Sequence, residues 1–212
     1  MSQVKIGLLR HFEVEKPMPS RWITSQELAQ WREEYDRAGV IPGDVELGGI
    51  QWKRCLSSDL KRACLTAEAV FAGPIHPMKE LREVQTSQLR TGQLRLPFGG
   101  WRSLLRLAWV ISHPSQRAAK NDFMARVRYL VDEILSQAEE NTLIVSHAGI
   151  MVFLRKELLR LGFVGPKFHI AQSGRLYVFE SMVDRAKRRT VPSSGPLQAV
   201  PGEVKRQATR SV

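Results

Sequence analysis

Cysteine is scarce in this sequence, with two residues among 212. A disulfide scaffold needs more cysteines than that, and a zinc site built from four cysteines is arithmetically excluded. Long apolar runs are also missing, because no stretch reaches the roughly 18 uninterrupted apolar residues of a transmembrane helix. The apolar run at residues 6–9 is too short for the core of a signal peptide. These absences predict a cytoplasmic protein with reduced thiols.

Acidic residues are outnumbered, with 21 Asp and Glu against 32 Lys and Arg and a net charge of +11. A basic surplus favours an anionic partner such as a phosphorylated small molecule, a nucleic acid or a membrane surface. Part of the surplus lies in residues 184–212, which hold seven basic and two acidic residues, three prolines and no aromatic residue. That composition predicts a disordered basic tail. No base-reading motif is present, so we expect no specific binding of nucleic acid.

Apolar patterning predicts an α/β domain over residues 1–183. The expected strands are 4–9, 53–57, 75–78, 142–145 and 175–180, and the expected helices are 25–38, 59–71, 101–111, 115–138 and 150–161. Ser25 is the expected N-cap of the first helix, and Ser58 or Asp59 that of the second. This order predicts a three-layer sandwich with a mainly parallel central sheet, helices on both faces and a helical cap inserted at about 84–113.

Polar side chains follow three of the predicted strands. Arg10-His11 ends the first strand, Ser57-Ser58 ends the second with Arg62 soon after, and Ser146-His147 ends the strand at 142–145. Ligands of open α/β sheets bind at the carboxyl ends of the strands, so we expect two histidines and two arginines to converge. Guanidinium groups match phosphate oxygens, and a neutral imidazole can attack phosphorus. The sequence therefore predicts a phosphoryl-transfer site at this edge.

Four segments in these places resemble motifs of one family. They are LLRHFEVE, SSDLKRACLTA, ELREV and IVSHAG, in chain order within about residues 4–150. They are similar to the Arg-His-Gly, Ser-Ser-x-x-x-Arg-Ala-x-x-Thr-Ala, Leu-x-Glu and second-histidine motifs of the histidine phosphatase superfamily, which includes the phosphoglycerate mutases. The four together, on predicted strand ends, are far more specific than any one alone.

The resemblance implies a role for each motif residue. His11 would be the nucleophile that becomes phosphorylated, and Arg10, Arg62 and His147 would hold the phosphoryl group. Glu83 would protonate the leaving oxygen and then activate water, although the neighbouring acids Glu13 and Glu80 are alternatives. The implied enzyme is a histidine acid-type phosphatase that hydrolyses an anionic phosphomonoester through phosphohistidine, without metal or other cofactor.

The sequence departs from the family pattern in two places. Phe12 stands where the family usually has Gly, and we expect its side chain at the rim of the pocket. Pro17 stands where mutases and many phosphatases have Asn, and the basic and tyrosine cluster of mutases is not recognisable. The phosphatase interpretation is therefore favoured over a mutase-like phosphotransferase. A catalytically weak protein that binds phosphorylated ligands is a further alternative.

The segment from Val84 to Asn121 contains no acidic residue. Its arginines and tryptophans leave three interpretations open. The segment could be a cap whose arginines select a multiply anionic substrate, a helix packed on the body through Trp101 and Trp109, or an amphipathic contact with a membrane surface through residues 95–111.

Overall fold

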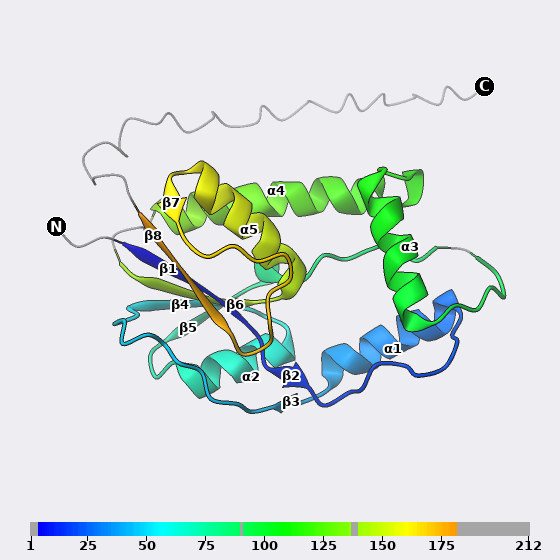
Figure 1. The fold of residues 1–212 in the computed structure, drawn as a ribbon, viewed down its shortest axis with the longest axis horizontal. Helices are drawn as coiled ribbons and strands as arrows, with labels where there is room; N and C mark the ends of the chain where they lie inside the picture. The colour runs from blue at the N-terminus through cyan, green and yellow to red at the C-terminus, as the bar shows by residue number, and fades with distance from the viewer. Residues whose placement is uncertain (1–3, 90, 137–139, 182–212) are drawn as a thin grey trace, which may run out of the picture. The chain divides into compact units, whose positions relative to one another are not determined.

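The computed structural model describes residues 4–89, 91–136 and 140–181, and within α4 it leaves the side chains of residues 135 and 136 undescribed. Its main feature is a six-stranded sheet in the order β5-β4-β6-β1-β8-β7 (Figure 1). The strands are β1 Lys5–Arg10, β4 Arg54–Ser58, β5 Ile75–Met78, β6 Thr142–Ser146, β7 Phe163–Val164 and β8 Leu176–Ser181, and a separate pair is β2 Glu13–Val14 with β3 Val40–Ile41. The first four strands in this order are parallel, β8 runs antiparallel to β1, and β7 runs antiparallel to β8. The predicted mainly parallel α/β fold is confirmed.

Helices cover both faces of this sheet (Figure 1). The helices are α1 Ser25–Arg37, α2 Lys61–Val70, α3 Phe98–Val110, α4 Pro114–Ser136 and α5 Ala148–Arg160, with a short 3₁₀ turn at Lys79–Leu81. Helix α2 packs on one face, and α4 and α5 pack on the other. Side chains alternate along β1, so Leu8 enters the α4–α5 core while Leu9 enters the α2 core. None of the described helices combines the length and apolarity that crossing a membrane requires.

Helix α1 starts at the predicted residue, and the other helix starts differ from the predicted ones by one to three residues. The N-cap of α1 is Thr24, not Ser25, because Thr24 and Glu27 exchange side-chain to backbone hydrogen bonds in a capping box. The N-cap of α2 is Leu60, which has no side-chain cap. Ser58 Oγ instead accepts the Leu60 N–H at 3.3 Å, and Asp59 pairs with Arg82. Ser58 and Asp59 therefore fix the chain just before α2, and neither of them is its N-cap.

The segment that carries α3 is anchored by its tryptophans. Trp101 is buried against Ile23 and Leu28 of the α1 region, and its indole N–H donates to the Ile23 carbonyl at 2.7 Å. Trp109 packs edge-on against Phe123 of α4, with ring centroids 5.8 Å apart. The interpretation that both tryptophans are core residues is confirmed. A role for residues 84–113 as a cap stays a prediction, and the predicted tail at 184–212 lies outside the described residues.

Trp101 offers a test of how firmly α3 is attached. Trp101→Ala should lower the free energy of unfolding by about 3–5 kcal/mol, because it leaves a large cavity and removes one of the two hydrogen bonds that the Ile23 carbonyl accepts. Urea unfolding would measure the loss. Trp22→Ala is the matched control, because Trp22 is 61% exposed and should change stability by less than about 0.5 kcal/mol. Equal effects of the two substitutions would contradict the anchoring role.

Candidate active site

The register of the sheet brings the predicted site residues together. Arg10 on β1 pairs with Ser146 on β6, and Ser57 on β4 pairs with Val145. The residues that follow, His11 and His147, therefore leave neighbouring parallel strands at the same level. Their rings lie 5.1 Å apart between centroids, at an interplanar angle of 57°. Both histidines are buried at the carboxyl edge of the sheet, where the sequence predicts them.

His11 is held in one tautomer by its own backbone. Its Nδ1 lies 2.5 Å from the Phe12 carbonyl oxygen, which can only accept, so Nδ1 carries the proton and Nε2 carries the lone pair. The pKa of His11 is lowered from its usual 6.5 to about 3, mainly by burial and further by the charges of Arg62 and Arg10. His11 is therefore a neutral imidazole at physiological pH, with an unprotonated nitrogen free to act as a nucleophile.

His147 is also neutral, and both of its ring nitrogens have partners. Arg62 Nε donates to His147 Nδ1 at 3.2 Å, so Nε2 carries the proton and donates to Ser58 Oγ at 2.9 Å. Burial, followed by the charge of Arg62, lowers the pKa of His147 well below its usual value. To donate to a phosphoryl group directly, the Nε2–H of His147 has to exchange Ser58 Oγ for a phosphoryl oxygen.

Residues of the segment SSDLKRACLTA fix the position of the backbone around Arg62. Thr66 accepts the Phe12 N–H at 2.9 Å and donates to the Arg62 carbonyl at 2.7 Å, which ties the loop after β1 to α2. Ala63 and Ala67 are fully buried against the sheet, where a larger side chain would push the helix away. In the segment SSDLKRACLTA, Ala63 and Ala67 thus set how closely α2 packs on the sheet, and Thr66 supplies the hydrogen bonds that hold the backbone of Phe12 and Arg62.

Arg10 supplies a second guanidinium from β1. Its Nη1 donates to the Ala171 carbonyl at 2.7 Å. Its Nε is buried and has no hydrogen-bond acceptor among the described residues. A buried donor without an acceptor is costly, and an anion bound between Arg10 and Arg62 would satisfy it.

Glu83 lies beside His147 because it caps α5. Its carboxylate accepts the backbone N–H groups of Val84, Gly149 and Ile150 at 2.8–3.2 Å. Gly149 permits this approach, since a Cβ there would lie 2.4 Å from Glu83 Oε1. The alternative Glu13 is exposed on β2, and the Glu80 carbonyl accepts a bond from Arg126. Of these three acids, Glu83 is the one whose carboxylate contacts the residues that follow His147.

Two residues of α1 that the sequence did not single out also belong to the site. Asp36 Oδ1 accepts from Arg62 Nη1 at 2.5 Å, so it compensates a guanidinium that is almost completely buried. The Tyr35 ring lies 5.1 Å from Arg62 Cζ. Burial raises the pKa of Tyr35, and the charges of Arg62, Arg10, Asp36 and Glu83 all act on its hydroxyl. The Tyr35 ring therefore lies against the guanidinium of Arg62.

The Phe12 side chain, which the sequence predicts at the rim of the pocket, is buried. Its side chain is 3% exposed and packs with Val14 and Val40, away from the solvent. The reason is the Phe12 N–H bond to Thr66, which fixes the backbone so that the ring enters this separate apolar cluster. Phe12 therefore acts on the site through its carbonyl, which holds His11.

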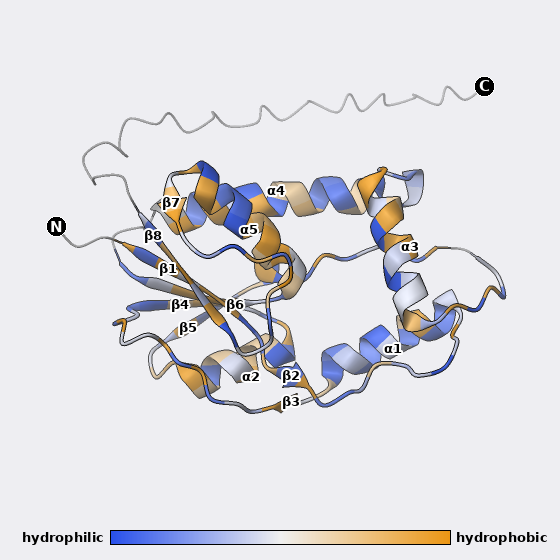
Figure 2. Ribbon diagram, in the orientation of Figure 1, coloured by the Kyte–Doolittle hydropathy of each residue, from blue (hydrophilic) through white to orange (hydrophobic). Residues whose placement is uncertain are grey.

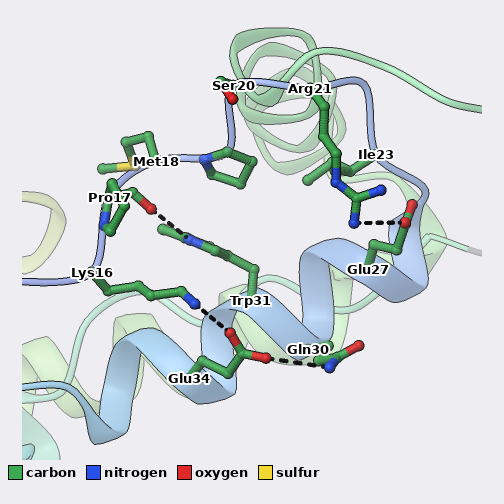
Figure 3. A pocket seen from close by; sticks show the side chains of 11 residues that line it. Lys16, Pro17, Met18, Ser20, Arg21, Ile23, Glu27, Gln30, Trp31 and Glu34 are labelled. Atoms are coloured by element: carbon green, nitrogen blue, oxygen red, sulfur yellow. Dashed lines mark hydrogen bonds and ion pairs between the residues drawn. The ribbon is translucent and has the colours of Figure 1, made fainter.

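A cavity of about 330 Å³ lies between the loop at residues 16–23 and the outer face of α1 (Figure 3). Its charged side chains are paired, Lys16 with Glu34 and Arg21 with Glu27. Trp31 lines it and donates to the Pro17 carbonyl at 3.0 Å. The Trp31 ring is 4.9 Å from that of Tyr35, so one aromatic ring separates the cavity from Arg62.

The three remaining histidines and Cys55 lie outside this site. His76, His113 and His169 are exposed, and the pKa of Cys55 is raised to about 12 by burial, which leaves it a core thiol. Among the described residues, no group of three His, Cys, Asp or Glu side chains gathers as metal ligands would.

Comparison with known proteins places these features in a family. The sequence matches the histidine phosphatase superfamily (branch 1) over residues 45–189. That range includes Arg62, Glu83 and His147, and it starts after Arg10 and His11. No curated protein matches the sequence.

Several solved structures are similar to this one. An alpha-ribazole phosphatase from Shigella flexneri is 20% identical with a TM-score of 0.49, and the match covers 82% of this chain and 89% of that chain. A mycobacterial glucosyl-3-phosphoglycerate phosphatase with inorganic phosphate is 17% identical with a TM-score of 0.48, over 81% of this chain and 97% of that chain.

The lowered histidine pKa values predict how stability depends on pH. Below about pH 6.5 the unfolded chain protonates His11, and the folded protein does so only near pH 3. Stability is therefore fully present above pH 6.5 and is lost as the pH falls, by about 1.4 kcal/mol per pH unit for each such histidine. Urea unfolding at pH 7 and pH 5 should show this loss, and His11→Gln should lose about 2 kcal/mol less than the wild type. An equal loss in both proteins would contradict the neutral state of His11.

Proposed function

Because the chain belongs to the histidine phosphatase superfamily (branch 1), we propose that it is a metal-independent phosphatase that hydrolyses a phosphomonoester through a phosphohistidine. The observation that carries the proposal is the neutral, oriented imidazole of His11 beside two guanidinium groups. The family match starts after His11, so the position of His11 next to His147 supports this role independently of the match.

The first step is attack of His11 Nε2 on the phosphorus of a bound monoester. The N–P bond forms as the bond to the leaving oxygen breaks, and Glu83 gives that oxygen a proton. Arg10 and Arg62 neutralise the charge on the phosphoryl oxygens, which is the main electrostatic contribution at such a site. His147 joins them when a phosphoryl oxygen replaces Ser58 Oγ as the acceptor of its Nε2–H.

In the second step, water attacks the same phosphorus, His11 becomes the leaving group, and Glu83 acts as a base instead of an acid. Glu83 takes a proton from water, the water oxygen attacks the phosphohistidine, and the N–P bond breaks. Inorganic phosphate leaves, and His11 regains its neutral state. The proton that Glu83 gave in the first step is thereby returned.

The leaving group lies toward α1 in this proposal. The Tyr35 ring lies against the Arg62 guanidinium and packs on Trp31, which lines the cavity of Figure 3 on its other side. An aromatic wall accepts the apolar face of a ring or sugar, while the paired charges of the cavity give no excess for a second phosphate. These features support a phosphatase over a mutase that binds a bisphosphorylated acid.

Removing the nucleophile gives the main test. His11→Ala should abolish phosphate release from a panel of phosphomonoesters assayed with a metal chelator. Arg62→Lys should lower kcat/KM by about 10²-fold or more, because an ammonium group cannot replace the guanidinium bonds to both His147 and Asp36. His113→Ala is the matched control and should retain full activity, since His113 is exposed.

Other outcomes of this assay separate the alternatives. Turnover in His11→Ala would overturn the proposed chemistry. Transfer of the phosphoryl group to another hydroxyl without phosphate release would identify a mutase-like enzyme. Binding of phosphorylated ligands without turnover in the wild type would identify a binding protein.

Glu83 can be tested through its two proton transfers. Glu83→Gln should lower kcat for alkyl phosphates by about 10²–10⁴-fold, because a carboxamide cannot protonate an alkoxide. With p-nitrophenyl phosphate, whose leaving group needs no proton, the variant should give a stoichiometric burst of nitrophenolate and accumulate phosphohistidine. Glu80→Gln is the control and should behave as the wild type. Unchanged turnover of alkyl phosphates by Glu83→Gln would reject its role.

A further inference from the structure

Three large aliphatic side chains are exposed at the end of α3. Leu107, Val110 and Ile111 are 56%, 64% and 62% exposed. Their spacing of three and four residues places them on one stripe of the helix, opposite the stripe that Trp101 and Leu105 bury. Figure 2 shows this end of α3 in the hydrophobic colour, beyond the helices that pack on the sheet.

Four basic residues of α3 and the first turns of α4 lie near this stripe. Arg102 and Arg106 are exposed on the adjacent stripe of α3, and Arg117 is exposed on the first turns of α4. Lys120 reaches back to donate to the carbonyls of Trp109 and Val110, which places its ammonium group at the end of α3. The sequence from 84 to 121 contains no acid that could neutralise these groups locally.

We propose that this α3–α4 corner, formed by Leu107, Val110 and Ile111 with Arg102, Arg106, Arg117 and Lys120, docks on the surface of an anionic lipid bilayer. Aliphatic side chains enter the boundary between headgroups and acyl chains, and arginines at their border pair with anionic headgroups. An acidic protein surface would also pair with the arginines. To bury the three aliphatic side chains, however, that protein would need a matching apolar pocket. A bilayer needs no such pocket, so it fits this corner better.

The proposed contact is peripheral and leaves the phosphatase site intact. Trp101 and Trp109 fix α3 to the body from its other face, so the corner can bind without unfolding the helix. The docking surface shares no residue with the site around His11. It is independent of the proposed reaction, and its test needs no activity.

Sedimentation with vesicles of stated composition tests the proposal on the full chain. The wild type should bind vesicles of phosphatidylcholine with 30% phosphatidylserine about tenfold or more tightly than vesicles of phosphatidylcholine alone. Leu107→Gln/Val110→Gln should weaken binding to the anionic vesicles by about tenfold, because the inserted apolar surface is lost. Arg102→Gln/Arg106→Gln should weaken it by a similar factor, and more strongly at low salt than at high salt.

Two matched controls distinguish docking from general stickiness or net charge. Val164→Gln/Ile170→Gln removes two side chains that are each 56% exposed on another part of the described chain. Arg128→Gln/Lys167→Gln removes the same charge from exposed positions outside the corner. Both controls should bind as the wild type does. The proposal fails if the corner variants bind as well as the wild type, if the controls lose as much binding as they do, or if neutral and anionic vesicles bind equally.

Discussion

The compensation of one buried charge, the guanidinium of Arg62, holds the site together. Arg62 is 4% exposed, and a cation at that depth is tolerated only when its donors have partners. Asp36 of α1 and the ring of His147 provide them, and Tyr35 covers the guanidinium face. One side chain of α2 therefore fixes where α1 sits and how the imidazole after β6 is oriented.

Burial of the Arg62 charge costs free energy, and the same burial keeps the imidazoles of His11 and His147 neutral. Both imidazoles are removed from water beside two arginines, so protonation of either ring would add charge to an already positive space. The hydrogen-bond partner of each neutral ring then decides which of its two nitrogens carries the proton. A carbonyl that can only accept leaves His11 with a free Nε2, while a guanidinium that can only donate leaves His147 with a protonated Nε2. Two chemically identical side chains acquire different roles without any difference in net charge.

The sequence predicted those parts of the site that depend on strand order. Parallel strands end at one edge, so residues that follow β1, β4 and β6 had to meet there, and the register places His11 beside His147. Asp36 and Tyr35 could not be found in the same way, because on α1 they look like the polar and aromatic residues of any amphipathic helix. Only the approach of α1 to α2 turns them into partners of Arg62. The N-cap of α1 was missed for a local reason: Thr24 and Ser25 are both good caps, and the acid at Glu27 decides between them.

Phe12 shows why a departure from a motif need not disturb its chemistry. A glycine in this position leaves the backbone free, whereas here the backbone is fixed by the bond from Phe12 N–H to Thr66 and by the bond from His11 Nδ1 to the Phe12 carbonyl. The side chain then needs space on the far side of the strand end. The ring occupies this space in the cluster with Val14 and Val40. Gly174 lies next to the ring, and its φ of +67° suits glycine. The orientation of His11 is thus kept by backbone atoms that any residue at position 12 except proline would supply.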